Sequence, residues 1–141
     1  MKVYAKTEYA CIAVLELARS HDRSEPVRIR DIADRHGIPP RFLVQILLQL
    51  KGAGLVQSTR GASGGYQLAK SPDQITLYEV MSVIEGQEPI NSATTTESPV
   101  SRVLLKIWRE IDEQEREILR SITLADLADR LKDETEQMYY I

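Results

Sequence analysis

The amino-acid sequence predicts a mainly α-helical protein with one small β-hairpin, arranged as a winged helix-turn-helix that is followed by a long C-terminal dimerisation helix. Two amphipathic segments are separated by a glycine turn at Gly37, and a glycine-rich hairpin follows them in residues 55–68. An apolar stripe of helical spacing then runs through residues 100–119. Composition agrees with a folded domain, because 43% of the 141 residues are hydrophobic.

The helix-turn-helix is expected in residues 29–50. Its first helix should end at Gly37, because glycine takes the left-handed conformation of a helix end with little steric cost. Pro39 and Pro40 then open the second helix, since proline is tolerated in a first turn, where a backbone N–H has no partner. The core face of the second helix is expected to consist of Phe42, Leu43, Ile46, Leu47 and Leu50.

The opposite face of this second helix carries Arg41, Gln45 and Gln49, spaced four residues apart. A guanidinium and two amides on one stripe are groups that read base edges in the major groove of DNA. Val44 on the same helix offers at most a contact to a thymine methyl group. Two functions therefore stay open, namely sequence-specific binding of double-stranded DNA, or a winged-helix adaptor that docks proteins without specific DNA binding.

The wing is predicted in residues 55–68. Residues 55–60 favour a strand, the glycine-rich run 61–65 can turn, and residues 66–68 alternate on the return. Arg60 lies at the shoulder of the tip, where a cation can enter a minor groove or pair with phosphate. The DNA-contacting residues expected from helix and wing together are Arg41, Gln45, Gln49, Arg60, Ser63 and Tyr66.

The charges of the chain are divided between its halves. Residues 1–70 hold 11 Lys and Arg against 6 Asp and Glu, whereas residues 71–141 hold 7 against 15. The net charge of -3 therefore combines a basic half at +5 with an acidic half at -8. Since phosphate attracts the first and repels the second, the two halves are expected to face opposite ways relative to DNA.

The acidic half is predicted to contain three helices. A capping box at residues 76–79 begins a packing helix, residues 87–99 form an exposed loop, and a long helix covers residues 100–121. A last short helix follows Thr123, and no role is assigned to the tail 133–141. The chain thus divides into a DNA-binding domain with its packing helix at residues 1–86, the loop 87–99, and the dimerisation helix with the C-terminal helix and tail at residues 100–141.

The apolar stripe on the long helix is longer than the core of so small a domain requires. A matching helix from a second subunit is its natural cover, and a homodimer is therefore expected. The dimerisation residues are expected to include Val100, Leu104, Ile107, Trp108, Ile111 and Ile118.

Several other functions are disfavoured by the sequence. The apolar runs are too short for a membrane span and no signal-peptide core follows Met1, so a cytoplasmic location without membrane contact is expected. Cys11 on the first helix is most simply a small buried hydrophobe. His21 and His36 lie in or beside turns without companions at metal-ligand spacing, so neither a metal site nor an enzyme is expected. His36 should act as a cation at a helix C-terminus.

At these residues the chain resembles the Rrf2 family of bacterial transcription regulators. The resemblance covers nearly the whole chain, and the Arg-Gly-x-x-Gly-Gly-Tyr wing is its most specific part. It implies a dimeric winged-helix regulator, most simply a repressor, that binds a palindromic operator. The residues that carry it lie at 8–10, 13–18, 32–38, 42–47, 50–56, 59–68, 75–80, 105–108 and 122–127.

The chain departs from many members of that family at the iron-sulfur cluster. Such relatives hold the cluster through three cysteines, two in the loop before the long helix and one at its start. Here Arg102 occupies the last cysteine position and Leu105 a position where some relatives supply histidine, while the loop offers only Glu88, Asn91, Glu97 and hydroxyl groups. The chain is therefore expected to belong to the cluster-free branch, with no cofactor, and to respond to a small molecule in the loop region or to a partner protein.

Overall fold

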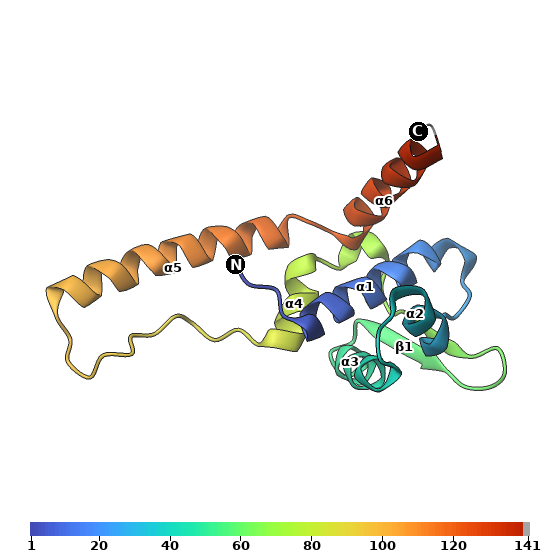
Figure 1. Ribbon diagram of the computed structural model, residues 1–141, viewed down its shortest axis with the longest axis horizontal. Helices are drawn as coiled ribbons and strands as arrows, with labels where there is room; N and C mark the ends of the chain where they lie inside the picture. The colour runs from blue at the N-terminus through green and yellow to red at the C-terminus, as the bar shows by residue number, and fades with distance from the viewer. Residues whose placement is uncertain (140–141) are drawn as a thin grey trace.

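The computed structural model describes residues 1–139 and contains six α-helices, two 3-10 turns and one hairpin in that range (Figure 1). The first four helices and the hairpin form one body, from which α5 extends far to one side. The elements are α1 Ala5–Arg19, η1 His21–Arg23, α2 Ile29–His36, α3 Pro40–Gly52, β1 Val56–Thr59, β2 Gly65–Leu68, η2 Pro72–Gln74, α4 Leu77–Glu85, α5 Pro99–Arg120 and α6 Leu124–Tyr139.

Helix α1 is the centre of the hydrophobic core. It packs against α3, α4, α6 and β2, and its small residues Ala10 and Ala13 are fully buried, which lets these neighbours approach closely. The expected core face of α3 is confirmed at four of its five positions, where the side chains are fully buried. These buried side chains are Leu43, Ile46, Leu47 and Leu50.

The prediction is wrong at the fifth position of this core face, which is Phe42. Phe42 is 37% exposed, because it lies at the flank of the apolar stripe, where it meets the ring of Tyr9 at a centroid distance of 6.2 Å. Its other neighbour is Arg41, whose guanidinium carbon lies 5.1 Å from the centroid of the Phe42 ring. Phe42 therefore forms the edge of the core.

The turn between α2 and α3 follows the predicted geometry. Gly37 has a φ of 65°, the left-handed conformation that glycine adopts at low cost, and Pro40 is the first residue of α3. The backbone N–H of Ile38 donates to the carbonyl of Ala33 at 3.1 Å, and the Ile38 side chain is buried. The turn is thus closed by a hydrogen bond and by an apolar anchor.

The wing is a two-stranded antiparallel hairpin with Val56 opposite Leu68 and Thr59 opposite Gly65. The chain just before α2 adds a third, one-residue strand, since Val27 and Tyr66 exchange two backbone hydrogen bonds of 2.8 Å. A Cβ atom on Gly65 would lie 2.5 Å from the carbonyl oxygen of Val27. Glycine is therefore required there for this close approach.

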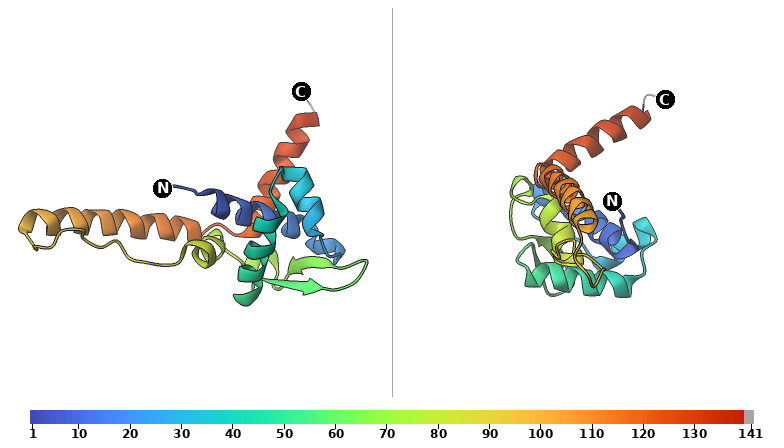
Figure 2. Two further views of the ribbon diagram at one scale, coloured as in Figure 1. Left: turned by 60° about the horizontal axis from the view of Figure 1, so that its bottom comes forward. Right: turned by 90° about the vertical axis from the view of Figure 1, so that its left-hand side faces the viewer.

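Capping boxes begin the helices of the second half, as predicted for α4. The hydroxyl of Thr76 accepts from the backbone N–H of Glu79 at 3.1 Å, and Ser98 caps α5 in the same way. The loop that joins α4 to α5 runs back along α5 (Figure 2). It is held there by Arg109, whose Nε donates to the carbonyl of Ile90 at 2.9 Å.

Helix α6 is longer than expected. It continues to Tyr139, beyond the predicted short helix that ends near residue 131, because the charged and polar residues that follow still favour a helix. A bridge between Thr76 and Thr123 fixes its start beside that of α4, where Leu124 is fully buried. Of the tail 133–141, residues 140–141 lie outside the described range. Within residues 1–139, no helix combines the length and apolar composition needed to cross a membrane.

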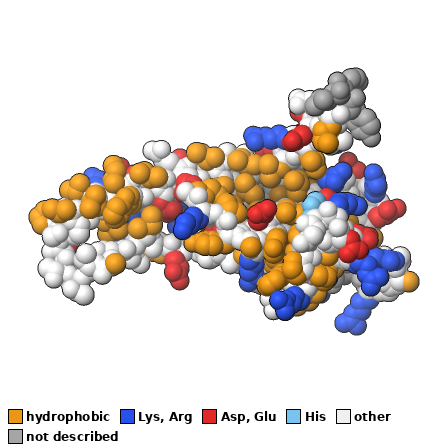
Figure 3. Space-filling model, in the orientation of Figure 1, with side chains coloured by type: hydrophobic (Ala, Val, Ile, Leu, Met, Phe, Trp, Pro, Cys, Tyr) orange, Lys and Arg blue, Asp and Glu red, His pale blue; other side chains and the backbone are white. Residues whose placement is uncertain are grey.

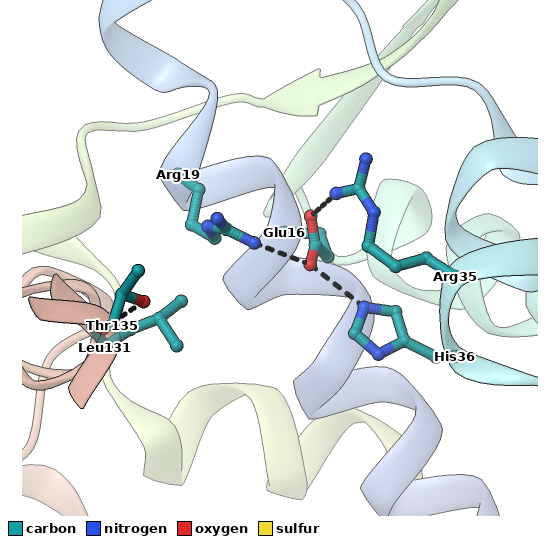
Figure 4. A network of polar contacts seen from close by, with 6 residues as sticks. All are labelled: Glu16, Arg19, Arg35, His36, Leu131 and Thr135. Carbon is teal, nitrogen blue, oxygen red and sulfur yellow. Dashed lines mark hydrogen bonds and ion pairs between the residues drawn. The ribbon is translucent and has the colours of Figure 1, made fainter. Parts of the chain in front are cut away.

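One buried carboxylate joins α1 to the end of α2 (Figure 4). Glu16 is 5% exposed, and its oxygens lie 2.7 Å from Nη1 of Arg35, 2.9 Å from Nε2 of His36 and 3.2 Å from Nη1 of Arg19. Burial alone would raise the pKa of Glu16, but the hydrogen bond from His36 and the charges of Arg35 and Arg19 outweigh it, so the pKa lies below its ordinary value. His36, the last residue of α2, thus connects the C-terminal end of that helix to a carboxylate on α1.

This network predicts a pH-dependent contribution to stability. Replacing Glu16 by Gln removes the charge that Arg19, Arg35 and His36 surround, and should lower the free energy of unfolding by about 1–3 kcal/mol at neutral pH. Because the pKa of Glu16 is lowered by folding, its contribution is complete above the ordinary glutamate pKa of about 4.3 and is lost as pH falls through the native pKa. Urea unfolding between pH 3 and 7 measures this difference.

The control is Glu25→Gln, which removes the same charge at an exposed position. The control variant should unfold like the wild type at every pH. A difference between wild type and Glu16→Gln that stays constant from pH 7 to pH 3 would contradict the proposed role of the carboxylate charge.

Candidate nucleic-acid interface

Helix α3 presents a polar stripe to solvent. Arg41, Gln45 and Gln49 are all exposed, on the side of α3 that lies away from its buried residues. Because the four buried leucine and isoleucine side chains hold the inner face of α3 in the core, the directions of the outer side chains are fixed. A guanidinium and two amides held at this spacing can donate to and accept from base edges in a major groove.

Apolar side chains lie on the same outer surface of α3. Val44 is 42% exposed and Leu48 is 55% exposed, and the ring of Phe42 is partly exposed. Such side chains can contact thymine methyl groups or a protein partner. The chemistry of the outer face is therefore mixed, with three hydrogen-bonding residues among apolar neighbours.

The wing lies beside α3 on one side of the molecule, while α5 extends away from both (Figure 2). Arg60 and Ser63 are exposed at its tip. The Tyr66 side chain is only half-exposed, since it packs at the margin of the core while its backbone pairs with Val27. The structure thus brings Arg60 and Ser63 to the free end of the hairpin and gives Tyr66 a packing role at its base.

Two cations support the wing and were not expected from the sequence. Arg28, the residue before α2, donates through Nη2 to the carbonyl of Ala62 at the tip of the hairpin. Lys51 in the last turn of α3 donates to the hydroxyl of Ser58 in β1 at 2.8 Å. Neither contact can be predicted from a local sequence pattern, because each joins residues from different elements that come together only in the folded chain. Both contacts position the hairpin relative to the helix-turn-helix.

Positive charge gathers on this side of the molecule. Figure 3 shows Lys and Arg side chains grouped around the free end of the hairpin. The residues up to 70, which build the helix-turn-helix and wing, have a formal charge of +5, whereas the remaining residues, which include α5 and α6, have -8. A polyanion would therefore be attracted to the α3 and wing surface and repelled by the C-terminal helices.

The loop before α5 has a donor set that does not fit an iron-sulfur cluster. Cluster iron is bound mainly by cysteine thiolates, and the one cysteine of this sequence is Cys11 on α1. Arg102 at the start of α5 instead approaches Glu97 at 3.5 Å, and Leu105 supplies no ligand atom. In the described range 1–139, no group of three or more His, Cys, Asp and Glu side chains is placed to hold a metal ion.

The thiol of Cys11 is suited to packing. It is half-buried against the core, and burial together with the negative charges of Glu85 and Glu8 raises its pKa to about 11. The thiolate is the reactive form of cysteine, so a thiol with so high a pKa is a poor nucleophile near neutral pH. The expectation that Cys11 acts as a small hydrophobe agrees with these surroundings.

Comparison with known proteins gives the same picture of fold and function. Residues 3–130 match the family model described as Rrf2, iron-dependent transcriptional regulator. The HTH-type transcriptional regulator CymR of Bacillus subtilis is 36% identical in an alignment of 142 residues that covers the whole of both chains.

Solved structures of such regulators superpose closely on this chain. The structure of CymR, the global cysteine regulator of B. subtilis, has a TM-score of 0.81 at 35% identity and covers 92% of this chain and 98% of its own. T. potens IscR has a TM-score of 0.76 at 34% identity, covering 97% of this chain and 90% of its own. The chain therefore belongs to the Rrf2 family of winged helix-turn-helix transcriptional regulators, which are DNA-binding proteins and not enzymes.

Proposed function

We propose that this regulator is a homodimeric, sequence-specific repressor that works without an iron-sulfur cluster. The observation that carries the proposal is the exposed stripe of Arg41, Gln45 and Gln49 on α3, beside a wing with a cation at its tip. A helix that presents such groups beside a basic hairpin has the geometry of a major-groove reader with a flanking minor-groove or phosphate contact. Occupation of an operator would then block transcription directly.

The residues would divide the work by position. Arg41, Gln45 and Gln49 would contact base edges, because α3 holds them in one row on its outer surface. Arg60 and Ser63 would contact phosphate or a minor groove, since both residues are exposed at the hairpin tip. Tyr66 would contribute through its phenol hydroxyl at the base of the wing, where phosphates that flank the site would pass.

The second half of the proposal concerns assembly. None of the residues of α5 is buried within one chain, and its apolar stripe is exposed along the whole helix. Figure 3 shows hydrophobic side chains along this extended helix. A second copy of α5 would cover them and would place two α3 helices symmetrically. The exposed fractions are 71% for Val100, 42% for Leu104, 48% for Ile107, 51% for Trp108, 59% for Ile111 and 62% for Ile118.

In this arrangement the chain has three functional parts. Residues 1–86 would bind DNA, the loop 87–99 would connect, and residues 100–141 would form the dimer. Because bacterial DNA lies in the cytoplasm, the protein would act there and not at a membrane. Its effector would be a small molecule or a partner protein.

A second candidate function follows from the apolar residues on α3. Val44 and Leu48 are exposed on the outer face of α3, to one side of the row formed by Arg41, Gln45 and Gln49. An apolar patch on an otherwise polar helix also suits a protein partner. The protein would then be a winged-helix adaptor, and the DNA experiment below separates the two functions.

DNA recognition gives the first prediction of this proposal. Selection from random duplexes should recover an imperfect palindrome whose half-sites lie about 10 bp, or a multiple of it, apart. Gln45→Ala should cost about 1–3 kcal/mol of discrimination at one base pair in each half-site. Arg60→Ala should weaken binding most at A·T-rich flanks, where the minor groove is narrow. Affinity should fall steeply with salt.

Arg102→Ala on α5 is the matched control for Arg60→Ala, because it removes the same exposed charge from the acidic half. It should bind the selected operator like the wild type. If selection recovers no motif and the Gln45 and Arg60 variants bind DNA as the wild type does, DNA recognition by this surface is refuted and the adaptor remains.

The dimer gives the second prediction. Ile111→Glu should dissociate the protein at micromolar concentration without unfolding it, because Ile111 is 59% exposed in the single chain. Sedimentation equilibrium measures the mass, and far-ultraviolet circular dichroism measures the helix content. Lys106→Glu introduces the same side chain at another exposed position of α5 and should leave the dimer intact. A wild-type protein that sediments as a folded monomer would disprove this assembly.

The third prediction concerns iron. Protein purified under anaerobic conditions should be colourless and should contain no stoichiometric iron or acid-labile sulfide, because the loop and the start of α5 lack thiolate ligands. Metal analysis and visible absorption spectra provide the measurement. Visible absorption that disappears with chelation, together with stoichiometric iron, would show that the cluster-free assignment is wrong.

A further inference from the structure

A cavity of about 950 Å³ lies between the C-terminal ends of α1 and α2 and the inner side of α6. It is distinct from the α3 and wing surface and from the loop 87–99, which contribute none of its lining. A volume near the upper end of the range for small-molecule sites is ample for a metabolite with its hydration water. In Figure 4, Arg19 and the Leu131–Thr135 turn of α6 lie on the same side of Glu16, and all of them line this cavity.

One wall of the cavity is a set of positioned cations. Arg19 and Arg35 each use one nitrogen on the buried carboxylate of Glu16, which holds both guanidinium groups in place. Their side chains are 45% and 57% exposed, so the remaining N–H donors of each fork stay accessible. Arg23 and Lys132 add two charges to the lining, and neither forms an ion pair within residues 1–139. This wall suits a carboxylate.

Carboxylates complete the lining. Asp129 and Glu136 project from α6, Asp73 from η2 and Asp22 from η1, and in the described part of the chain none of the four takes part in an ion pair. With Glu16 the lining therefore holds five carboxylates against four arginine and lysine side chains. Such a balance disfavours a polyanion such as a nucleotide, and it equally disfavours a ligand that carries only positive charge.

We propose that this cavity binds a small zwitterion of the amino-acid or short-peptide class. Its carboxylate would bind the free donors of Arg19 and Arg35, with Lys132 adding positive charge to the lining, and its ammonium group would bind Asp129 on the α6 wall. Leu131 and the alanines of α6 supply an apolar part of the lining for the ligand's side chain. The site thus offers both charges and an apolar surface, which a free amino acid or dipeptide matches.

A ligand in this cavity would be coupled to the helix-turn-helix, a step that rests on the proposed function. Arg35 lies in the last turn of α2, two residues before Gly37 and the turn into α3. A ligand carboxylate on the free donors of Arg35 and Arg19 would draw both guanidinium groups away from Glu16, and so would weaken the tie between α1 and α2. Occupancy should therefore lower operator affinity, by about fivefold or more.

The experiment first measures binding without DNA. Full-length protein is screened by thermal shift against the twenty free L-amino acids and a set of glycyl dipeptides, and hits are titrated by calorimetry. At least one zwitterion should bind, and its decarboxylated amine and deaminated acid should bind about tenfold more weakly or worse, because each loses one charge-assisted contact. If no member of the panel binds, or if either truncated analogue binds as well as the zwitterion, the site assignment is overturned.

Matched variants on α6 locate the site. Asp129→Asn and Lys132→Gln change groups that line the cavity, whereas Asp133→Asn and Arg130→Gln make the same changes at exposed neighbours outside the lining. The first pair should lower affinity about tenfold, and the second pair should not. All four positions are exposed, so folding should persist, and circular dichroism checks this. Equal affinities in the two pairs would refute this location.

Operator affinity is then measured with and without the zwitterion. A ligand that binds at the cavity but leaves operator affinity unchanged would overturn the coupling and leave the site standing. A protein that binds no operator in any condition would refute the proposed function, and it would leave the calorimetric result on the cavity unaffected. The two failures are thus distinguishable.

Discussion

The architecture depends on the burial of one helix. Helix α1 packs against α3, α4, α6 and the wing, and its alanines allow these elements to approach its backbone closely. Its one buried carboxylate, Glu16, could not be placed there without compensation, and Arg35 and His36 of α2 supply it. The same helix thus positions α3 through apolar contacts and α2 through charge. The helix-turn-helix is held by both.

Function follows from what this packing leaves uncovered. The inner side of α3 is anchored in the core by four buried side chains, namely Leu43, Ile46, Leu47 and Leu50. Because this fixes the orientation of the helix, its polar stripe always faces solvent. The wing is fixed to the same body through Val27, Arg28 and Lys51 rather than left as a free loop. Helix α5 is the opposite case, since its apolar side chains have no cover within one chain. The outer face of α3 therefore carries a fixed row of polar side chains, whereas the apolar face of α5 has no cover within one chain.

Sequence patterns predicted the features that local chemistry decides. The glycine at the end of α2, the prolines at the start of α3, the glycine-rich hairpin and the capping box of α4 are each set by residues close together in the chain. The Glu16 network, the contact of Arg28 with Ala62 and the α1–α6 cavity were not predicted. Each joins residues far apart, which no periodicity records. Phe42 and the end of α6 were misplaced because a flank position and a charged helix give weak signals.

The central claim is that the outer face of α3 recognises DNA while α5 stays outside the complex. The most direct measurement is the set of side-chain amide NMR resonances on addition of the selected operator duplex. The account predicts large shifts for Gln45 and Gln49, and none for Gln114, which lies on α5. Shifts confined to Gln114, or unchanged resonances of Gln45 and Gln49 at saturating operator, would contradict the claim.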